Sequence, residues 1–271
     1  MLFRQSLYLY MMWGIFLISI LVVSLVFLPK LLSKKKPSLT TFPENWKAIL
    51  SEYVPFYAAL SLDKKTRFEN DVLQFINHHK ITAVDTTLDE VTKVLVAASA
   101  IIPIFNFEHW NYPNLKEVLI FEERIESANH TDDNEILGMV TNDSFGDGVL
   151  LLSKQDLLNG FQIKTSKSNV GIHEFVHLID KADGEVDGLP MLLMNPHLLH
   201  AWSESISQEI NRIRHKGEKD IDAYGATSAA EFLAVISEYF FKRPQLLERK
   251  HPELYAILTQ VFKQDVGAKV D

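Results

Sequence analysis

The feature that most limits how this 271-residue chain can fold is an uncharged apolar run from Leu7 to Leu28. At about 1.5 Å per helical residue the run reaches roughly 33 Å, enough to cross the hydrocarbon core of a bilayer. A cleaved signal peptide is the alternative, but the run is too long for one and no small-residue cleavage site follows it. The sequence therefore predicts one transmembrane helix.

Basic residues gather on the C-terminal side of this run. Arg4 precedes it, whereas Lys30 and three consecutive lysines at 34–36 follow it, and the lysine-rich side of a span normally stays in the cytoplasm. The charge run, Ser/Thr residues and two prolines of residues 33–45 are typical of a linker. We therefore predict a transmembrane anchor at 1–32, a juxtamembrane linker at 33–45 and a cytoplasmic folded domain at 46–265.

The predicted domain is acidic and has no cysteine. The formal net charge of the whole chain is −8, and the first 36 residues carry only basic charges, so the rest is more acidic still. Such a body repels phosphate backbones, which argues against a direct nucleic-acid ligand. Without cysteine, any zinc ion has to be held by His, Asp or Glu side chains.

Helical periodicity dominates the chain after the linker. Short runs rich in β-branched and aliphatic residues, separated by Asn, Asp and Gly turns, predict a small sheet. The class is α+β, mostly helical. Helices are expected at 46–80, 87–102, 168–181, 196–215, 228–241 and 252–263, and strands at 117–121, 136–140 and 149–152.

The segment "GIHEFVHLID" at 171–180 has the residue types of a zinc-peptidase site. On a helix, residues four apart lie on one face, so His173 and His177 can share one metal ion. Glu174 lies about 100° further round, where it can act as a base toward water on the metal. An ordinary helix with solvated histidines is the alternative reading, and a third ligand is needed to decide.

Three carboxylates are candidates for that ligand. Asp183 lies six residues after His177, where metzincins carry their third ligand, but those enzymes need Gly where Asp180 stands. Glu231 and Glu238 share one face of a downstream helix, about 10 Å apart along its axis. Glu231 could instead serve a capping box that begins at Ser228, and Glu238 could orient a ligand histidine. The residues alone leave these alternatives open.

Three segments of the sequence together resemble a known family. "GIHEFVHLIDKADGEVDGLP", "DIDAYGATSAAEFLAVISEYFFKRPQLL" and "KEVLIF" are similar to the Mlc titration factor A family of zinc-dependent peptidases. These are gluzincins whose fold resembles the catalytic domain of anthrax lethal factor. The resemblance implies one zinc ion bound by His173, His177 and Glu231, with Glu174 as the base and Tyr224 as a hydrogen-bond donor to the oxyanion.

The resemblance also implies an activity and a partner. The family's activity is of the aminopeptidase type, so we expect a peptide or protein substrate. Bacterial relatives bind the repressor Mlc, so a binding module that sequesters a transcriptional repressor at the membrane is the alternative function. Known relatives are soluble, whereas this sequence predicts a single-pass protein of the bacterial inner membrane.

The other polar residues are less specific. Asp180 could hydrogen-bond a ligand histidine or could be a surface carboxylate. "VLLLSKQD" could be an edge strand that aligns a peptide substrate, or simply core. The remaining histidines considered, which have no partner glutamate at metal-motif spacing, are read as structural or solvated: His78, His79, His197 and His200.

Overall fold

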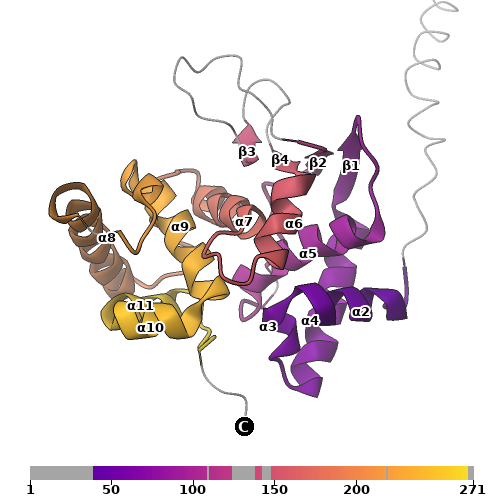
Figure 1. Cartoon of the computed structure of the whole chain (residues 1–271), viewed down its shortest axis with the longest axis horizontal. Helices are drawn as coiled ribbons and strands as arrows, with labels where there is room; N and C mark the ends of the chain where they lie inside the picture. Colours follow the sequence, from indigo (N-terminus) through magenta and orange to yellow (C-terminus); the bar gives the residue numbers. More distant parts are fainter. Residues whose placement is uncertain (1–38, 109, 124–137, 142–147, 218, 268–271) are drawn as a thin grey trace, which may run out of the picture. The chain divides into compact units, whose positions relative to one another are not determined.

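The computed structural model (Figure 1) describes residues 39–108, 110–123, 138–141, 148–217 and 219–267, without the side chains of 138–141 and 216. The predicted span Leu7–Leu28 lies outside these residues. Within them, no helix is both long enough and apolar enough to cross a membrane. The chain divides into the units Met1–Leu39 and Thr40–Asp271, and the second carries the fold.

The segment predicted as helical over 46–80 forms three helices: α2 (Glu44–Tyr53), α3 (Pro55–Ala58) and α4 (Leu62–His78). The break falls at Pro55, which has no N–H to continue α2 and instead occupies the first turn of α3. Phe42 is buried and packs edge-on against Trp46, with ring centroids 5.6 Å apart. Ordered packing therefore starts before Trp46.

Four strands form one sheet in the order β1-β2-β4-β3. β1, β2 and β4 are parallel, and β3 runs antiparallel to β4. Of the two readings of "VLLLSKQD", the core strand is confirmed and the edge strand is not, because β4 is flanked by β2 and β3 and is buried along its length. β1 was not predicted. The strands are β1 (Lys80–Val84), β2 (Glu117–Phe121), β3 (Gly138–Thr141) and β4 (Val149–Ser153).

Helices α5 (Glu90–Ile104) and α7 (Val170–Asp180) pack against each other beside the sheet. Asp89 caps α5 by accepting a hydrogen bond from the N–H of Thr92 at 2.7 Å. The two helices approach closely at Gly171, where an added Cβ would collide with the side chain of Ser99. Gly171 thus lets the helix that carries both candidate ligand histidines lie directly on the core helix α5.

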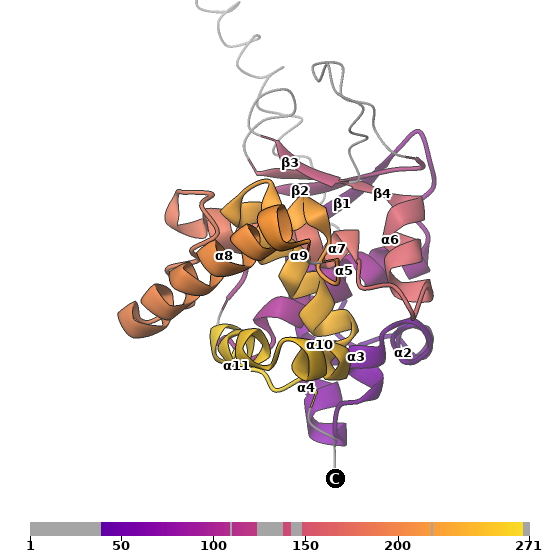
Figure 2. The same cartoon turned by 60° about the vertical axis from the view of Figure 1, so that its left-hand side comes forward.

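The C-terminal part is helical, as predicted, although α6 and α10 were not foreseen. Figure 2 shows the sheet along one side of the unit, with the helices gathered on the other. The mostly helical α+β class is confirmed. The remaining elements are α6 (Lys154–Gln162), η1 (Lys181–Asp183), α8 (Pro196–Lys216), η2 (Ala223–Ala226), α9 (Ala229–Lys242), α10 (Pro244–Lys250) and α11 (Pro252–Val261).

Candidate metal centre

The two histidines of the sequence motif occupy successive turns of α7. Their Nε2 atoms lie 3.1 Å apart, and the ring centroids of His173 and His177 are separated by 4.7 Å. Asn169 caps the helix, because its Oδ1 accepts a hydrogen bond from the N–H of Ile172 at 3.1 Å. Local helix geometry therefore brings the two nitrogens together.

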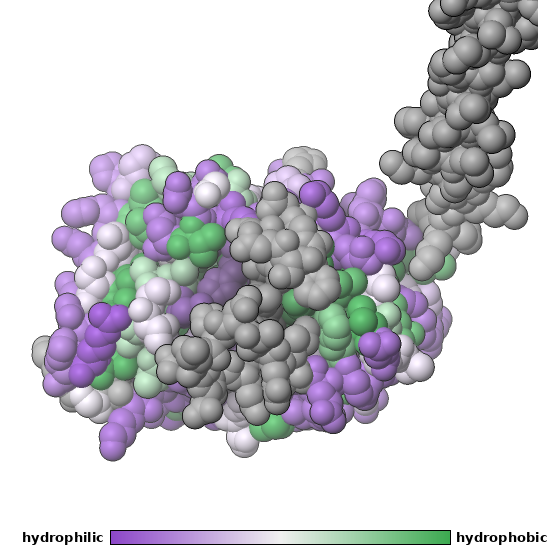
Figure 3. Space-filling view, turned by 90° about the horizontal axis from the view of Figure 1, so that it is seen from above, coloured by the Kyte–Doolittle hydropathy of each residue, from purple (hydrophilic) through white to green (hydrophobic). Residues whose placement is uncertain are grey.

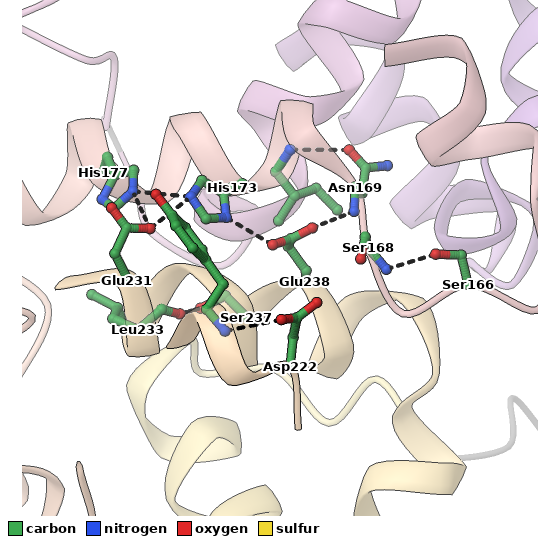
Figure 4. A network of polar contacts seen from close by, with 12 residues as sticks. Ser166, Ser168, Asn169, His173, His177, Asp222, Glu231, Leu233, Ser237 and Glu238 are labelled. Carbon is green, nitrogen blue, oxygen red and sulfur yellow. Dashed lines mark hydrogen bonds and ion pairs between the residues drawn. The ribbon is translucent and has the colours of Figure 1, made fainter. Parts of the chain in front are cut away.

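Glu231 completes the cluster from the first turn of α9. Its Oε2 lies 3.1 Å from Nε2 of His173 and 3.4 Å from Nε2 of His177. Ser228 caps α9 by accepting the N–H of Glu231, while the Glu231 carboxylate turns toward the histidines (Figure 4). Of the described His, Asp and Glu side chains, only these three group closely enough to hold one metal ion.

The three ligand atoms fit a tetrahedral metal. Two ligands at about 2.0–2.1 Å from a tetrahedral Zn²⁺ lie roughly 3.3 Å from each other. The separations within the cluster, 3.1, 3.1 and 3.4 Å, are close to that value. Two imidazole nitrogens and one carboxylate oxygen are also a donor set that zinc prefers, with a fourth position left for water or substrate.

Glu238 binds the opposite nitrogen of the same ring. Its Oε1 lies 2.7 Å from Nδ1 of His173, and its Oε2 accepts a hydrogen bond from the backbone N–H of Asn169. With a metal ion bound, an Nδ1–H that donates to Glu238 would leave the Nε2 lone pair for the metal. Such a contact is typical of a residue that orients a metal-binding histidine, which is the alternative role that the sequence offered for Glu238.

The sequence model of the glucose-regulated metallo-peptidase M90 family matches residues 30–263. The chain belongs to the metallo-peptidase M90 family. Membership supports a metallopeptidase-type function and, together with the His/His/Glu cluster, suggests a bound metal ion, for which zinc is the usual choice.

Curated relatives agree with this family. Mlc titration factor A from Cronobacter sakazakii is 28% identical over 237 residues, which cover 82% of this chain and 87% of the relative. Mlc titration factor A from Pectobacterium atrosepticum is 25% identical over 252 residues, covering 88% and 92%. An uncharacterized protein from Synechocystis sp. is 27% identical over 231 residues, covering 81% and 84%. The resemblance noted from the motifs is thus confirmed.

Carboxylates dominate the electrostatics of this M90 centre. Burial lowers the pKa of His173, but the charge of Glu238 and the hydrogen bonds to Glu231 and Glu238 outweigh burial and raise it well above its ordinary value. Burial raises the pKa of Glu231, yet hydrogen bonds from the two histidines bring it down to about 2. The cluster therefore favours positive charge, which a divalent cation would supply.

Glu174 is almost fully buried beside the cluster, with 4% of its surface exposed. Burial raises its pKa, against the opposing charges of His173 and His177. A carboxylate with a raised pKa is a better proton acceptor near neutral pH than an exposed one. The position suits the base role that the motif predicts, and that role remains a prediction.

Tyr224 lies at the mouth of the centre, in the short helix η2. The centroid of its ring is 6.3 Å from that of His173, and the residue is 49% exposed. Burial and the charge of Glu231 raise the pKa of Tyr224 to about 12. The phenol therefore stays protonated and can donate a hydrogen bond to a ligand in the site. The face seen in Figure 3 has a hydrophilic hollow beside apolar residues.

Other predicted residues lie outside the cluster. Asp183 accepts hydrogen bonds from the N–H groups of Glu185 and Met191 and so organises a turn. Asp180 is fully buried rather than on the surface, and its Oδ2 accepts the N–H of Gly188 at 2.8 Å. Among the described residues Asp180 makes no hydrogen bond to His173 or His177, although burial raises its pKa and the charge of His177 opposes that rise. His197 and His200 lie on α8, and His78 and His79 at the end of α4.

Sequence reasoning did not single out Asn169, which joins the start of α7 to Glu238. Its signal was present, because Asn directly before a helical apolar pattern is a typical N-cap. No local sequence pattern predicts the hydrogen bond from its backbone N–H to Glu238, because the two residues are far apart in sequence and meet only when α7 packs on α9.

Proposed function

We propose that this protein is a membrane-anchored, zinc-dependent peptidase of the aminopeptidase type. The observation that carries the proposal is the spacing of three ligand atoms, from His173, His177 and Glu231, at the edge lengths of a tetrahedral zinc site. Family membership supports the same class of reaction.

Each side chain of the centre has a separate role in the proposed hydrolysis. His173, His177 and Glu231 would hold the zinc ion, which would supply Lewis acidity toward water and toward the substrate carbonyl. Glu174 accepts the proton of the attacking water and passes it to the leaving amine. The Tyr224 hydroxyl donates a hydrogen bond to the oxyanion that forms from the scissile carbonyl. Glu238 keeps the His173 ring in the required tautomer and orientation.

A Glu174→Gln variant of the full-length protein tests the reaction. The amide retains the size of the carboxylate but cannot take a proton, so we expect unchanged zinc content and a loss of hydrolysis of about 10² to 10⁴-fold. Glu52→Gln, an exposed residue on α2, is the matched control. Unchanged turnover in the Glu174 variant would remove this residue from the mechanism.

The aminopeptidase preference has its own test. A peptide library offered with free and with acetylated N-termini should be cleaved only in the free form, and only while zinc is bound. Equal cleavage of both forms would show an endopeptidase instead.

Anchoring rests on the uncharged run Leu7–Leu28 and on the lysines that follow it. In this proposal residues 1–32 form a single-pass anchor in the bacterial inner membrane, 33–45 a linker, and 46–265 the catalytic domain in the cytoplasm. Reporter fusions after Lys36 should be active only as cytoplasmic reporters. A periplasmic signal would reverse the proposed orientation.

A second candidate function is the binding of a transcriptional repressor. Relatives carry the name Mlc titration factor A, so a homologous Mlc-like repressor is the partner to test. Co-purification that persists in the Glu174→Gln variant would support a binding role separate from hydrolysis. If no such complex forms and cleavage depends on zinc, only the peptidase function would be supported.

A further inference from the structure

A second candidate site is a cavity of about 200 Å³ beside the start of α7, and none of the three clustered residues is part of its lining. Its walls come from α3, α5, α6, α7 and the end of α9. Most of the wall is apolar, with three aromatic rings from Phe56, Phe161 and Phe241. A cavity of about 150 Å³ with similar walls can hold benzene, so this one has room for a ring and a small polar group.

The polar side chains of the wall all offer N–H groups. They belong to Lys164, Asn169 and Lys242, and no carboxylate is found among the described residues that line the cavity. Oδ1 of Asn169 is already used as the cap of α7. An occupant therefore meets donors and cationic charge, and no acceptor from a side chain.

Asn169 is the residue whose state points to a ligand. It is fully buried, and its Nδ2 has no hydrogen-bond partner among the described residues. Burying an amide donor without a hydrogen-bond acceptor costs roughly 1–3 kcal/mol of folding free energy, so buried donors in proteins seldom lack an acceptor. An acceptor atom inside the cavity would satisfy this donor.

Lys242 supplies charge at the same place. Its Nζ donates to the backbone carbonyls of Gly160 and Ile163, which leaves one of its three N–H groups for another acceptor. Burial lowers the pKa of Lys242 to about 8, so the group is still mainly protonated at pH 7. Lys164 is exposed and lies at the rim.

We propose that this cavity binds a small monocarboxylate with an aromatic or short aliphatic body. The carboxylate accepts hydrogen bonds from Asn169 and Lys242, and the apolar body lies among the phenylalanine rings. This site is independent of the proposed peptidase function. It is nevertheless connected to the metal centre, because the backbone N–H of Asn169 donates to Glu238, which holds His173.

Calorimetric titration of the full-length protein with benzoate tests the proposal, with benzyl alcohol as a neutral ligand of the same shape. The titration is made on zinc-stripped protein, because a carboxylate can also bind a zinc ion. We expect benzoate to bind at least 10-fold more tightly than benzyl alcohol. Equal binding of the two ligands, or benzoate binding that requires zinc, would overturn the proposal.

Two variants locate the binding. Asn169→Asp keeps the capping oxygen but replaces the amide donor with a carboxylate, and Lys242→Met removes the charge. Each should weaken benzoate at least 10-fold and leave benzyl alcohol unchanged. Lys116→Met, which changes an exposed lysine outside the cavity, is the control. If Lys242→Met fails to fold, Asn169→Asp decides alone, and unchanged benzoate affinity in that variant would contradict the assignment.

Discussion

The carboxylate of Glu238 lies 2.7 Å from Nδ1 of His173, on the side of the imidazole ring that faces away from His177 and Glu231. Two glutamates of α9 therefore contact the two nitrogens of one ring. Glu231, at the start of the helix, meets the nitrogen that faces the candidate metal position. Glu238, two turns later, holds the nitrogen behind it.

This division predicts different metal contents for two variants. Glu231→Ala removes a proposed ligand and should leave the purified protein with little zinc. Glu238→Ala removes only an orienting contact and should weaken zinc affinity by about 10–100-fold. Elemental analysis and competition with a chelator measure both. Greater zinc loss in the Glu238 variant would reverse the roles assigned to the two residues.

Tyr224→Phe isolates the proposed oxyanion contact. The phenol is half exposed and its ring centroid lies 6.3 Å from that of His173, and phenylalanine keeps this ring while it removes the hydroxyl. We expect kcat to fall by about 10² with little change in KM, because the hydrogen bond forms mainly in the transition state. Zinc content and thermal unfolding should match those of the wild type. A normal kcat would assign the tyrosine to an ordinary surface role.

Gly188 lies in the loop that follows η1. It packs this loop against the backbone at the start of α9. Its φ is +77°, and an added Cβ would collide with the carbonyl of Ala229. Gly184 has a φ of +106° with open space around it. Gly184→Ala should cost only the backbone strain, about 1–2 kcal/mol of unfolding free energy. Gly188→Ala adds the collision and should cost clearly more, as urea unfolding of both variants would show.

Asp220 is the centre of a polar network that includes Tyr239 of α9. Its carboxylate contacts Lys167 at 2.8 Å, the Tyr239 hydroxyl at 2.8 Å, His251 at 3.2 Å, and also Lys250. Burial raises the pKa of Asp220, but these hydrogen bonds outweigh burial and hold it well below the ordinary value. The charged form is thus stabilised by folding.

Asp220→Asn should therefore destabilise the protein by about 2–3 kcal/mol near neutral pH. Because the folded pKa is depressed, the stabilisation is fully present above the unfolded pKa of about 3.9 and is lost as the pH falls below it. The difference between variant and wild type should be constant above about pH 5 and shrink below about pH 4. Asp85→Asn, an exposed residue with a φ of +54° that asparagine tolerates, is the control.

Local patterns predicted much of the fold. The strand at 117–121 was placed at its observed bounds, and the helices carrying the histidines and the two glutamates were found within a few residues. Such patterns succeed because helix and strand periods depend on nearby residues. They failed at β1 and α10, which are short, and over 46–80, where Pro55 breaks the single expected helix.

For the metal centre, the sequence by itself determined that His173 and His177 share one helix face, because a spacing of four residues has that consequence in any α-helix. It also placed Glu231 and Glu238 on one face of a second helix, with either able to be the ligand. The family resemblance favoured Glu231, and the packing of α7 on α9 gives a physical reason for that choice. That packing sets which carboxylate reaches Nε2 and which reaches Nδ1, a choice made by contacts between residues roughly sixty positions apart.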